Sequence, residues 1–287
     1  MTARRRRIFL VTGGSGLLGS RLVRKLLEDG QRVRVLDTRI GELRDIRTHP
    51  KLELLGVGGD HRKGGMVDKS TVYRATRNVN VIYHLAINWN SHSWRHTLPL
   101  PELFDANIRG THNLLEAARS RKIDHFLVSS SAAVYGETQR TLSSRDRSLL
   151  KGVVDEESAC RPCLWDGDPG PGYAILKLAI ENLCLMHHHA YKLPVTVFRI
   201  EYVFTNMEQF RDGANVHVDD VVRAFLIATL NRRSYGQVFN LAYPVPYMSI
   251  RKISGMLDWK PEATTSFLRS NIANSLASWN RPRKIHN

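Results

Sequence analysis

The hydrophobic pattern at the amino end of the chain alternates between strand and helix. An apolar run at 7–12 leads into a group of glycines, and apolar residues then recur at helical spacing between Leu17 and Leu27. Gly30 ends this helix, and apolar residues alternate again over 32–36 as a second strand. The pattern therefore predicts a strand, a turn, a helix and a second strand at the start of the chain.

The same alternation continues as far as residue 200. The sequence predicts, in chain order, strands at 52–55 and 79–84, a helix at 108–119, a strand at 126–129, a helix at 173–190 and a strand at 195–199. Strands that alternate with helices are typical of a parallel sheet with helices on both faces. We therefore predict an α/β fold built on a doubly wound parallel sheet.

Residues 136–172 interrupt this rhythm, because glycine and proline are frequent there and no periodicity persists, which predicts a long loop. After residue 200 the pattern weakens to a helix at 219–230, a strand at 237–241, a short helix near 250–257 and a polar, basic tail. The sequence thus divides into a well-patterned region, 1–200, and a reduced carboxy-terminal region, 201–287.

Glycines recur at three-residue intervals between the first strand and the first helix, in the segment Thr-Gly-Gly-Ser-Gly-Leu-Leu-Gly. Gly13 suits a tight turn, Gly16 lets the backbone approach a pyrophosphate, and Gly19 lets the helix pack against the sheet. Leu17 and Leu18 follow at the start of the helix, whose unpaired N–H groups and positive dipole end attract phosphates. Strand, glycines and helix together predict the binding of a dinucleotide cofactor.

An acidic residue at the end of the second strand bears on the choice of cofactor. Asp37 lies eighteen residues after Gly19, where a carboxylate accepts hydrogen bonds from the adenosine ribose hydroxyls, and this favours NAD. Arg39 is placed to neutralise the additional phosphate of NADP, as is Arg34 if its side chain turns that way. Because Asp37 would repel that phosphate, we predict NAD and keep NADP as the alternative.

Five further segments occur in a fixed order. They are Gly59-Asp60, Val-Ile-Tyr-His-Leu-Ala at 81–86, a helix that begins Asn-Ile-Arg-Gly-Thr at 107, Ser-Ser-Ser-Ala-Ala-Val-Tyr-Gly at 129–136, and Tyr173-x-x-x-Lys177. With the glycine motif they make residues 8 to about 200 resemble the extended short-chain dehydrogenase/reductases, the family of NAD-dependent sugar epimerases and dehydratases. The resemblance implies a Rossmann-like fold, a contact from Asp60 to the adenine ring, and a cofactor lined by Leu85 and Ala86.

The last of these motifs carries candidate chemistry. Tyr173 and Lys177 lie four residues apart on a predicted helix, so they share one face. An ammonium beside a phenol stabilises the phenolate, and a tyrosine perturbed in this way exchanges a proton near neutral pH. The resemblance implies that Ser131 polarises the substrate oxygen and that Lys177 also holds the nicotinamide ribose. We therefore predict a hydride-transferring enzyme with Ser131, Tyr173 and Lys177 as its catalytic residues.

Other polar residues within the motifs are expected to be structural. His84 is typical of a satisfied core histidine, and Asn107 and Tyr135 are typical of packing and backbone-bonding residues. The acids that follow His217, in the segment His-Val-Asp-Asp, suit the amino terminus of a helix. None of these residues is predicted to move a proton.

The chain has three cysteines, an odd and sparse set that does not suggest a secreted disulfide framework. A reducing, cytoplasmic location is therefore expected. Cys160 and Cys163, with the histidines at 187–189, resemble metal ligands, but one cysteine pair without a second pair is a weak pattern. We predict no metal.

The composition adds one question that the motifs leave open. With 42% apolar and 24% charged residues, the 287-residue chain is typical of globular proteins, and no apolar stretch is long enough to cross a bilayer. Its net charge of +15, from 42 Lys and Arg residues against 27 Asp and Glu, favours phosphate-rich ligands or nucleic acid. Because the excess is scattered in short groups, we expect only weak, nonspecific nucleic-acid binding beside a small-molecule substrate.

The carboxy-terminal region departs from the family pattern. The segment after Arg199 reaches His217 almost at once, so a large part of the usual substrate region is absent, and the loop at 137–172 is placed to cover the substrate instead. Three functions stay open: a dehydrogenase, epimerase or dehydratase for nucleotide-sugars, which leads by resemblance, a steroid-like alcohol dehydrogenase, and a non-catalytic NAD- and RNA-binding protein. The helices at 108–119 and 173–190 are candidates to pair in a homodimer.

Overall fold

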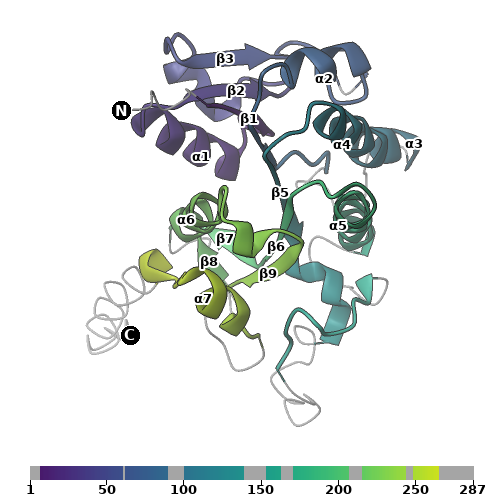
Figure 1. Ribbon diagram of the computed structural model, residues 1–287, viewed down its shortest axis with the longest axis vertical. Helices are drawn as coiled ribbons and strands as arrows, with labels where there is room; N and C mark the ends of the chain where they lie inside the picture. The colour runs from purple at the N-terminus through teal and green to yellow at the C-terminus, as the bar shows by residue number, and fades with distance from the viewer. Residues whose placement is uncertain are drawn as a thin grey trace, which may run out of the picture.

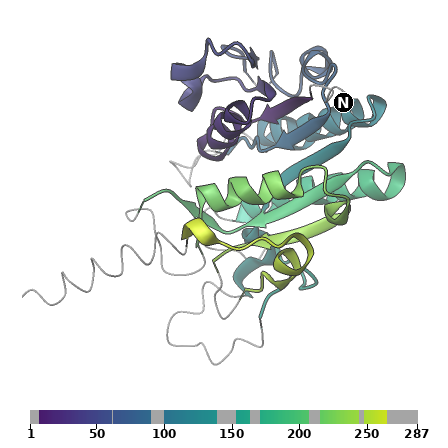
Figure 2. The same ribbon diagram turned by 60° about the vertical axis from the view of Figure 1, so that its left-hand side comes forward.

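The computed structural model describes residues 7–60, 62–89, 100–138, 153–162, 171–206, 215–243 and 248–264. Within these residues a seven-stranded parallel sheet carries helices on both faces (Figure 1, Figure 2). No helix in the described ranges is long and apolar enough to cross a membrane. The predicted α/β fold with a doubly wound parallel sheet is confirmed.

The strands lie in the order β3-β2-β1-β4-β5-β6-β9, and each neighbouring pair is parallel. Their bounds are β1 (Ile8–Thr12), β2 (Arg32–Leu36), β3 (Leu52–Leu55), β4 (Val81–His84), β5 (His125–Ser131), β6 (Val195–Ile200) and β9 (Gln237–Leu241). The chain runs outward from β1 to β3 and then returns to β4 on the other side of β1. In open parallel sheets, a ligand crevice forms at the carboxyl ends of the strands where the order reverses in this way.

Two hydrophobic cores attach the helices to the two faces of the sheet. One core holds α1 (Leu17–Glu28), α6 (Val218–Ala228) and α7 (Arg251–Leu257), and the other holds α2 (Lys69–Ala75), α4 (Gly110–Ser120) and α5 (Pro171–Tyr191). Alternate residues of β1 serve the two cores, since Val11 lies in the first and Leu10 in the second, both fully buried. Burial of each such side chain contributes about 1.5–3 kcal/mol.

Shorter elements connect these units. They are the 3-10 helices η1 (Gly41–Ile46), η3 (Ala132–Thr138) and η7 (Arg232–Ser234), the helix α3 (Leu100–Phe104), the π-helical turn η2 (Asp105–Arg109), and a parallel pair, β7 (Tyr202–Phe204) and β8 (Asn215–His217). The sequence pattern missed these elements and α2. The start of α2 had a signal, because the Asp68 side chain accepts hydrogen bonds from the backbone N–H groups of Ser70 and Thr71.

Residues beyond 200 complete the sheet. β9 pairs with β6, and the ring of Phe225 in α6 lies 4.5 Å from that of Phe198 in β6. At the start of α6, the buried carboxylate of Asp220 accepts hydrogen bonds from the Thr264 backbone N–H at 2.6 Å and hydroxyl at 2.7 Å. His217 caps the same helix, so the structural role predicted for this segment is confirmed. Elements on both sides of residue 200 therefore pack on the same sheet.

Candidate active site

The glycines after β1 form what we call the glycine-rich cradle (Gly13, Gly16 and Gly19). Gly13 has φ +69°, and a Cβ atom there would lie 2.7 Å from the Ala86 backbone, while a Cβ on Gly19 would overlap the Gly13 carbonyl oxygen. The chain's own packing thus requires these two glycines. A Cβ on Gly16, in contrast, would meet nothing nearer than 3.5 Å, so the space beside Gly16 is open to a ligand.

The start of α1 faces the same open space. Gly16 is the N-cap residue and has no side chain to accept from the first N–H groups, and the first turn holds no acid. Leu17 is 45% exposed beside it, whereas Leu18 packs against the core. An uncapped amino terminus on a twelve-residue helix suits phosphate, because its N–H groups and dipole are directed at the ligand. The residues present therefore fit the pyrophosphate of a dinucleotide.

Asp37 joins the cradle to the end of β2. Its half-buried carboxylate accepts hydrogen bonds from the Ser15 backbone N–H at 3.1 Å, from the Ser15 hydroxyl at 2.5 Å and from the Arg39 backbone N–H at 3.1 Å. The Arg39 side chain is exposed. Asp37 thus orders the glycine-rich turn, a role that the sequence did not indicate.

Asp60 closes a turn next to Asp37. Its exposed carboxylate accepts hydrogen bonds from the backbone N–H groups of Arg62 and Lys63, both at 2.7 Å. The neighbouring turn is tied to the β2 end by a hydrogen bond from the Gly58 N–H to the Thr38 carbonyl, 3.0 Å. The two acids named by the sequence therefore lie on adjacent loops at the carboxyl edge of the sheet.

The end of β4 packs directly on the cradle. The Leu85 N–H donates to the Thr12 carbonyl at 3.1 Å, and the Ala86 N–H lies 3.4 Å from the Thr12 hydroxyl. The buried His84 ring bonds the hydroxyls of Thr12 and Thr111, each at 2.8 Å, and burial lowers its pKa to about 3. His84 is therefore a neutral, satisfied core residue, as predicted, while Leu85 and Ala86 border the cradle.

Ser131, Tyr173 and Lys177 meet where β5 ends and α5 begins, and we call them the Ser-Tyr-Lys cluster. A side-chain hydrogen bond joins Tyr173 to Ser131, and the Lys177 ammonium lies 5.8 Å from the centre of the Tyr173 ring. Lys177 is buried, and its Nζ donates to the Ser129 carbonyl at 2.8 Å and the Ser129 hydroxyl at 3.2 Å. The three residues named from the sequence are thus brought together.

Burial changes the acid–base properties of this cluster. It lowers the pKa of Lys177 to about 7 and raises the pKa of Tyr173 to about 12, although the hydrogen bond with Ser131 acts in the opposite direction. The expected lowering of the phenol's pKa is therefore outweighed by burial in this structure. The physical reason is that both groups lose water, which disfavours the charged form of each.

Trp89 borders the cluster, and sequence reasoning did not single it out. Its ring meets the Tyr173 ring edge to face with centroids 5.6 Å apart. Its buried indole N–H has no acceptor among the described residues. Asn107 fixes the backbone beside it, because its side chain bonds the Asn88 N–H at 2.7 Å and the Asn88 carbonyl at 2.9 Å. The structural role predicted for Asn107 is confirmed, and it serves to hold Trp89.

A buried polar network connects α5 to β6. The Arg199 guanidinium pairs with Glu181 at 2.6 Å, both being buried, and donates to the Tyr135 hydroxyl at 2.8 Å. The Tyr135 hydroxyl in turn donates to the Asn240 side-chain carbonyl at 2.7 Å. Since Glu181 lies one helical turn after Lys177, this network fixes the helix that carries the cluster. Tyr135 has the structural role that was predicted, and its hydroxyl fulfils it by bonding the side chains of Arg199 and Asn240.

The cysteines and histidines that resemble metal ligands do not form a metal site in the described part of the chain. Among the residues described, no group of three His, Cys, Asp or Glu side chains could hold a metal ion. Cys163 lies outside the described residues, and burial raises the pKa of Cys160. His187 is buried, with its ring bonded to the Leu183 carbonyl and to Glu116.

The strand order, the glycine-rich turn at its reversal point and the helix that follows define a dinucleotide-binding α/β protein. The model of the NAD dependent epimerase/dehydratase family matches residues 9–216, and the chain belongs to this family. The family resemblance drawn from the motifs is thereby confirmed.

Two curated relatives illustrate the range of this family. A UDP-glucose 4-epimerase from Erwinia amylovora is 35% identical over 130 residues, which are 44% of this chain and 37% of that protein. A dTDP-glucose 4,6-dehydratase from Streptomyces griseus is 28% identical over 265 residues, 81% of this chain and 72% of that protein. The chain spans about half the length of the first curated relatives it matches, between 37% and 54%.

Solved structures share the fold. The UDP-glucuronic acid 4-epimerase from Bacillus cereus, in complex with UDP-glucuronic acid and NAD, has a TM-score of 0.70 at 20% identity, covering 88% of this chain and 94% of that one. The dTDP-glucose 4,6-dehydratase DesIV from Streptomyces venezuelae, with NAD and TYD bound, also has a TM-score of 0.70, at 21% identity over 92% and 97% of the two chains. The Rossmann-like fold predicted from the motifs is confirmed.

Proposed function

We propose that this chain binds NAD and catalyses reversible hydride transfer at a secondary alcohol carbon of a nucleotide-sugar. The observation that carries the proposal is the meeting of Ser131, Tyr173 and Lys177 at the end of β5, two strands away from the glycine-rich cradle. Relatives that are named nucleotide-sugar epimerases and dehydratases support this substrate class.

The cradle and its neighbours would hold the cofactor. Gly16 and the start of α1 receive the pyrophosphate, and Asp37 accepts from the adenosine ribose, which favours NAD over NADP. Asp60 would lie near the adenine, with Leu85 and Ala86 along the nicotinamide half. When bound, the nicotinamide supplies the site that accepts and returns the hydride.

The cluster would move the proton. Tyr173 takes the proton from the substrate hydroxyl, while Ser131, already bonded to Tyr173, orients the same oxygen. Lys177 donates two hydrogen bonds to Ser129 and, when charged, has a third N–H group that can donate to a ribose hydroxyl. Its charged form also lowers the phenol's pKa, so proton transfer depends on keeping Lys177 protonated in the complex.

Two observations narrow the substrate and the reaction. The buried indole N–H of Trp89 beside Tyr173 favours an oxygen-rich substrate over a steroid-like one, because an apolar ligand would leave it without an acceptor. Dehydration needs an acid and a base beyond the group that serves hydride transfer, and Ala132 and Ala133, the next residues after Ser131, supply neither.

A homodimer in the cytoplasm completes the proposal. α4 and α5 lie side by side on one face of the sheet, and α5 exposes the apolar side chains of Ile175 (48%) and Met186 (51%) to solvent. Exposed apolar residues on α5, with α4 beside it, suit a two-fold contact. Cys160 and Cys184 are free thiols, which supports a reducing compartment.

The test begins with the cofactor. NAD should raise the thermal stability of the protein more than NADP does at equal concentration, and Asp37→Ala should narrow the difference. Incubation with NAD and UDP-glucose, UDP-glucuronic acid or dTDP-glucose should then yield an epimerised sugar, detected by NMR. Stabilisation by NADP alone, or turnover of sterols but of no nucleotide-sugar, would overturn the proposal.

A further inference from the structure

The edge of the sheet opposite the cradle carries exposed, unpaired cations. Arg7, Lys122, Lys192 and Arg232 precede β1, β5, β6 and β9 respectively, so the parallel sheet places all four at its amino edge. Each is exposed, and none makes an ion pair within the described ranges of the chain. Basic residues after α4, α5 and α6 also offset helix dipoles, whereas Arg7 follows none of the helices that the structure describes.

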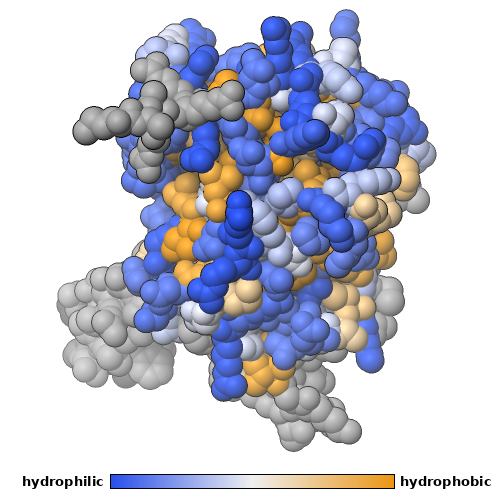
Figure 3. Space-filling view, viewed as in Figure 1, coloured by the Kyte–Doolittle hydropathy of each residue, from blue (hydrophilic) through white to orange (hydrophobic). Residues whose placement is uncertain are grey.

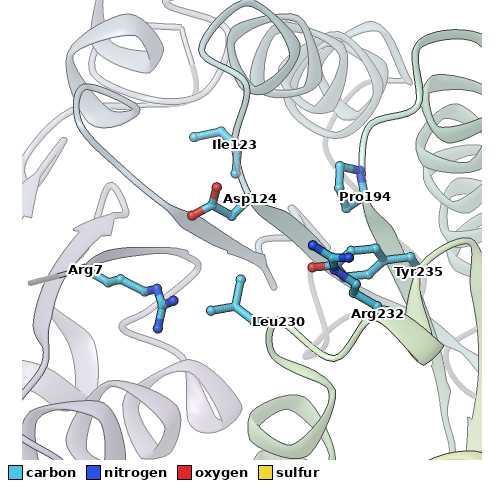
Figure 4. A pocket seen from close by; sticks show the side chains of 7 residues that line it. All are labelled: Arg7, Ile123, Asp124, Pro194, Leu230, Arg232 and Tyr235. Atoms are coloured by element: carbon cyan, nitrogen blue, oxygen red, sulfur yellow. The ribbon is translucent and has the colours of Figure 1, made fainter. Parts of the chain in front are cut away.

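A hollow lies among these cations. It has a volume of about 490 Å³, is open to solvent, and is lined by Arg7, Ile123, Asp124, Pro194, Leu230, Arg232 and Tyr235 (Figure 4). Figure 4 shows Arg7 on one side, Arg232 and Tyr235 on the other, and Asp124 between them. Lys122 and Lys192 are within two residues of Ile123 and Pro194, so they add charge at the rim.

The contents of the hollow limit what it can bind. The Asp124 carboxylate, held by the Asn80 side chain at 3.1 Å, disfavours a lone anion in the middle. The two arginines on opposite sides instead suit phosphates that lie apart on one ligand. Tyr235 is half-buried and packs against the His125 ring, with ring centroids 4.7 Å apart, so it presents a fixed aromatic surface beside Arg232.

We propose that this hollow is a binding site for single-stranded nucleic acid, with Arg7 and Arg232 on successive phosphates and a base stacked on Tyr235. An aromatic side chain inside a cationic groove is the arrangement that proteins use for unpaired strands, whose bases are free to leave the stack. The site brings together four of the 42 Lys and Arg residues that produce the net charge of +15. It lies at the opposite edge of the sheet from the cradle and is independent of the proposed enzymatic function.

The test uses the full chain and a fluorescein-labelled single-stranded RNA of about 12 nucleotides, with binding followed by anisotropy from about 50 to about 200 mM salt. R7Q/R232Q should weaken binding roughly tenfold and reduce the slope of log affinity against log salt by about 1.4, as expected for two lost phosphate contacts on a single strand. Tyr235→Leu should weaken binding at least about fivefold with the salt slope unchanged.

The matched control is R44Q/R47Q, which removes the same charge from two exposed arginines at and just after η1. It should change affinity less than about twofold. Equal losses of RNA affinity in the two double variants would show that only the overall charge matters and would contradict the proposed site. Equally tight binding of AMP or of duplex RNA would overturn it as well, and stabilisation by NAD checks that each variant is folded.

Discussion

The glycine-rich cradle and the Ser-Tyr-Lys cluster lie at the same edge of one sheet, yet they are built differently. The cradle comes from one stretch, Gly13 to Gly19, braced by Asp37 at the end of the next strand. The cluster joins Ser131 to Tyr173, which lie 42 residues apart in the sequence, and depends on Trp89 and on the buried network of Arg199 and Glu181. Local backbone shape thus determines the cradle, and packing between distant elements determines the Ser-Tyr-Lys cluster.

On the face shown in Figure 3, hydrophobic residues gather between the parts of the molecule that carry α1 and α6.

The largest effect should come from the support of the cluster. Glu181→Gln leaves the buried Arg199 guanidinium without its counter-charge, which typically costs about 3–5 kcal/mol of unfolding free energy. Urea unfolding measures the loss. Glu53→Gln, which removes the 49%-exposed partner of Arg34, is the control and should change stability by at most about 1 kcal/mol. Equal losses would mean that the buried pair is not what holds α5.

The next largest effect should come from a substitution that disrupts the glycine-rich cradle by steric overlap. A methyl group on Gly19 overlaps the Gly13 carbonyl and comes within 2.7 Å of the Gly14 Cα, so Gly19→Ala should lose about 1–3 kcal/mol and abolish stabilisation by NAD. Gly255→Ala in α7 meets nothing within 4 Å and should be neutral or gain about 0.5–1 kcal/mol. Thermal unfolding with and without NAD separates the two. Unaltered NAD binding in Gly19→Ala would contradict the role given to the cradle.

The buried Lys177 should make stability depend on pH. Its pKa of about 7 lies below the ordinary 10.5, so between these values the unfolded chain binds a proton that the folded protein has released. Unfolding free energy should therefore rise with pH by up to about 1.4 kcal/mol per unit. Compared at pH about 7.5 and about 8.5, the wild type should gain more stability than Lys177→Met. If both proteins gained the same stability, Lys177 would be solvated in the folded protein and its pKa would not be lowered.

The smallest effect concerns Trp89. Trp89→Phe keeps an aromatic ring against Tyr173 but removes the buried N–H, so KM for the nucleotide-sugar should rise about five- to tenfold, the value of one hydrogen bond, with kcat little changed. Steady-state kinetics gives both constants. A fall in kcat with KM unchanged would place the N–H in the transition state rather than in substrate binding.

The cradle and the pair of Tyr173 and Lys177 were predicted from spacings that the chain itself displays, the glycine intervals and the four residues from Tyr173 to Lys177, whereas Ser131 came from the family resemblance. It did not predict Trp89, because a tryptophan after β4 carries no periodic signal until α5 is packed beside it. The pKa of Tyr173 was misjudged because burial cannot be read from helical spacing. The short strands β7 and β8 were missed because each has three residues.

The central claim is that Tyr173 transfers the proton while the cradle binds the cofactor, and Tyr173→Phe separates the two. NAD affinity by calorimetry and hydride transfer to the nicotinamide by single-turnover absorbance should be measured for wild type and variant with a nucleotide-sugar substrate. We expect equal NAD affinity and a rate lower by about 10²–10⁴-fold, the usual contribution of a positioned acid–base group. Turnover of Tyr173→Phe at the wild-type rate would contradict the account.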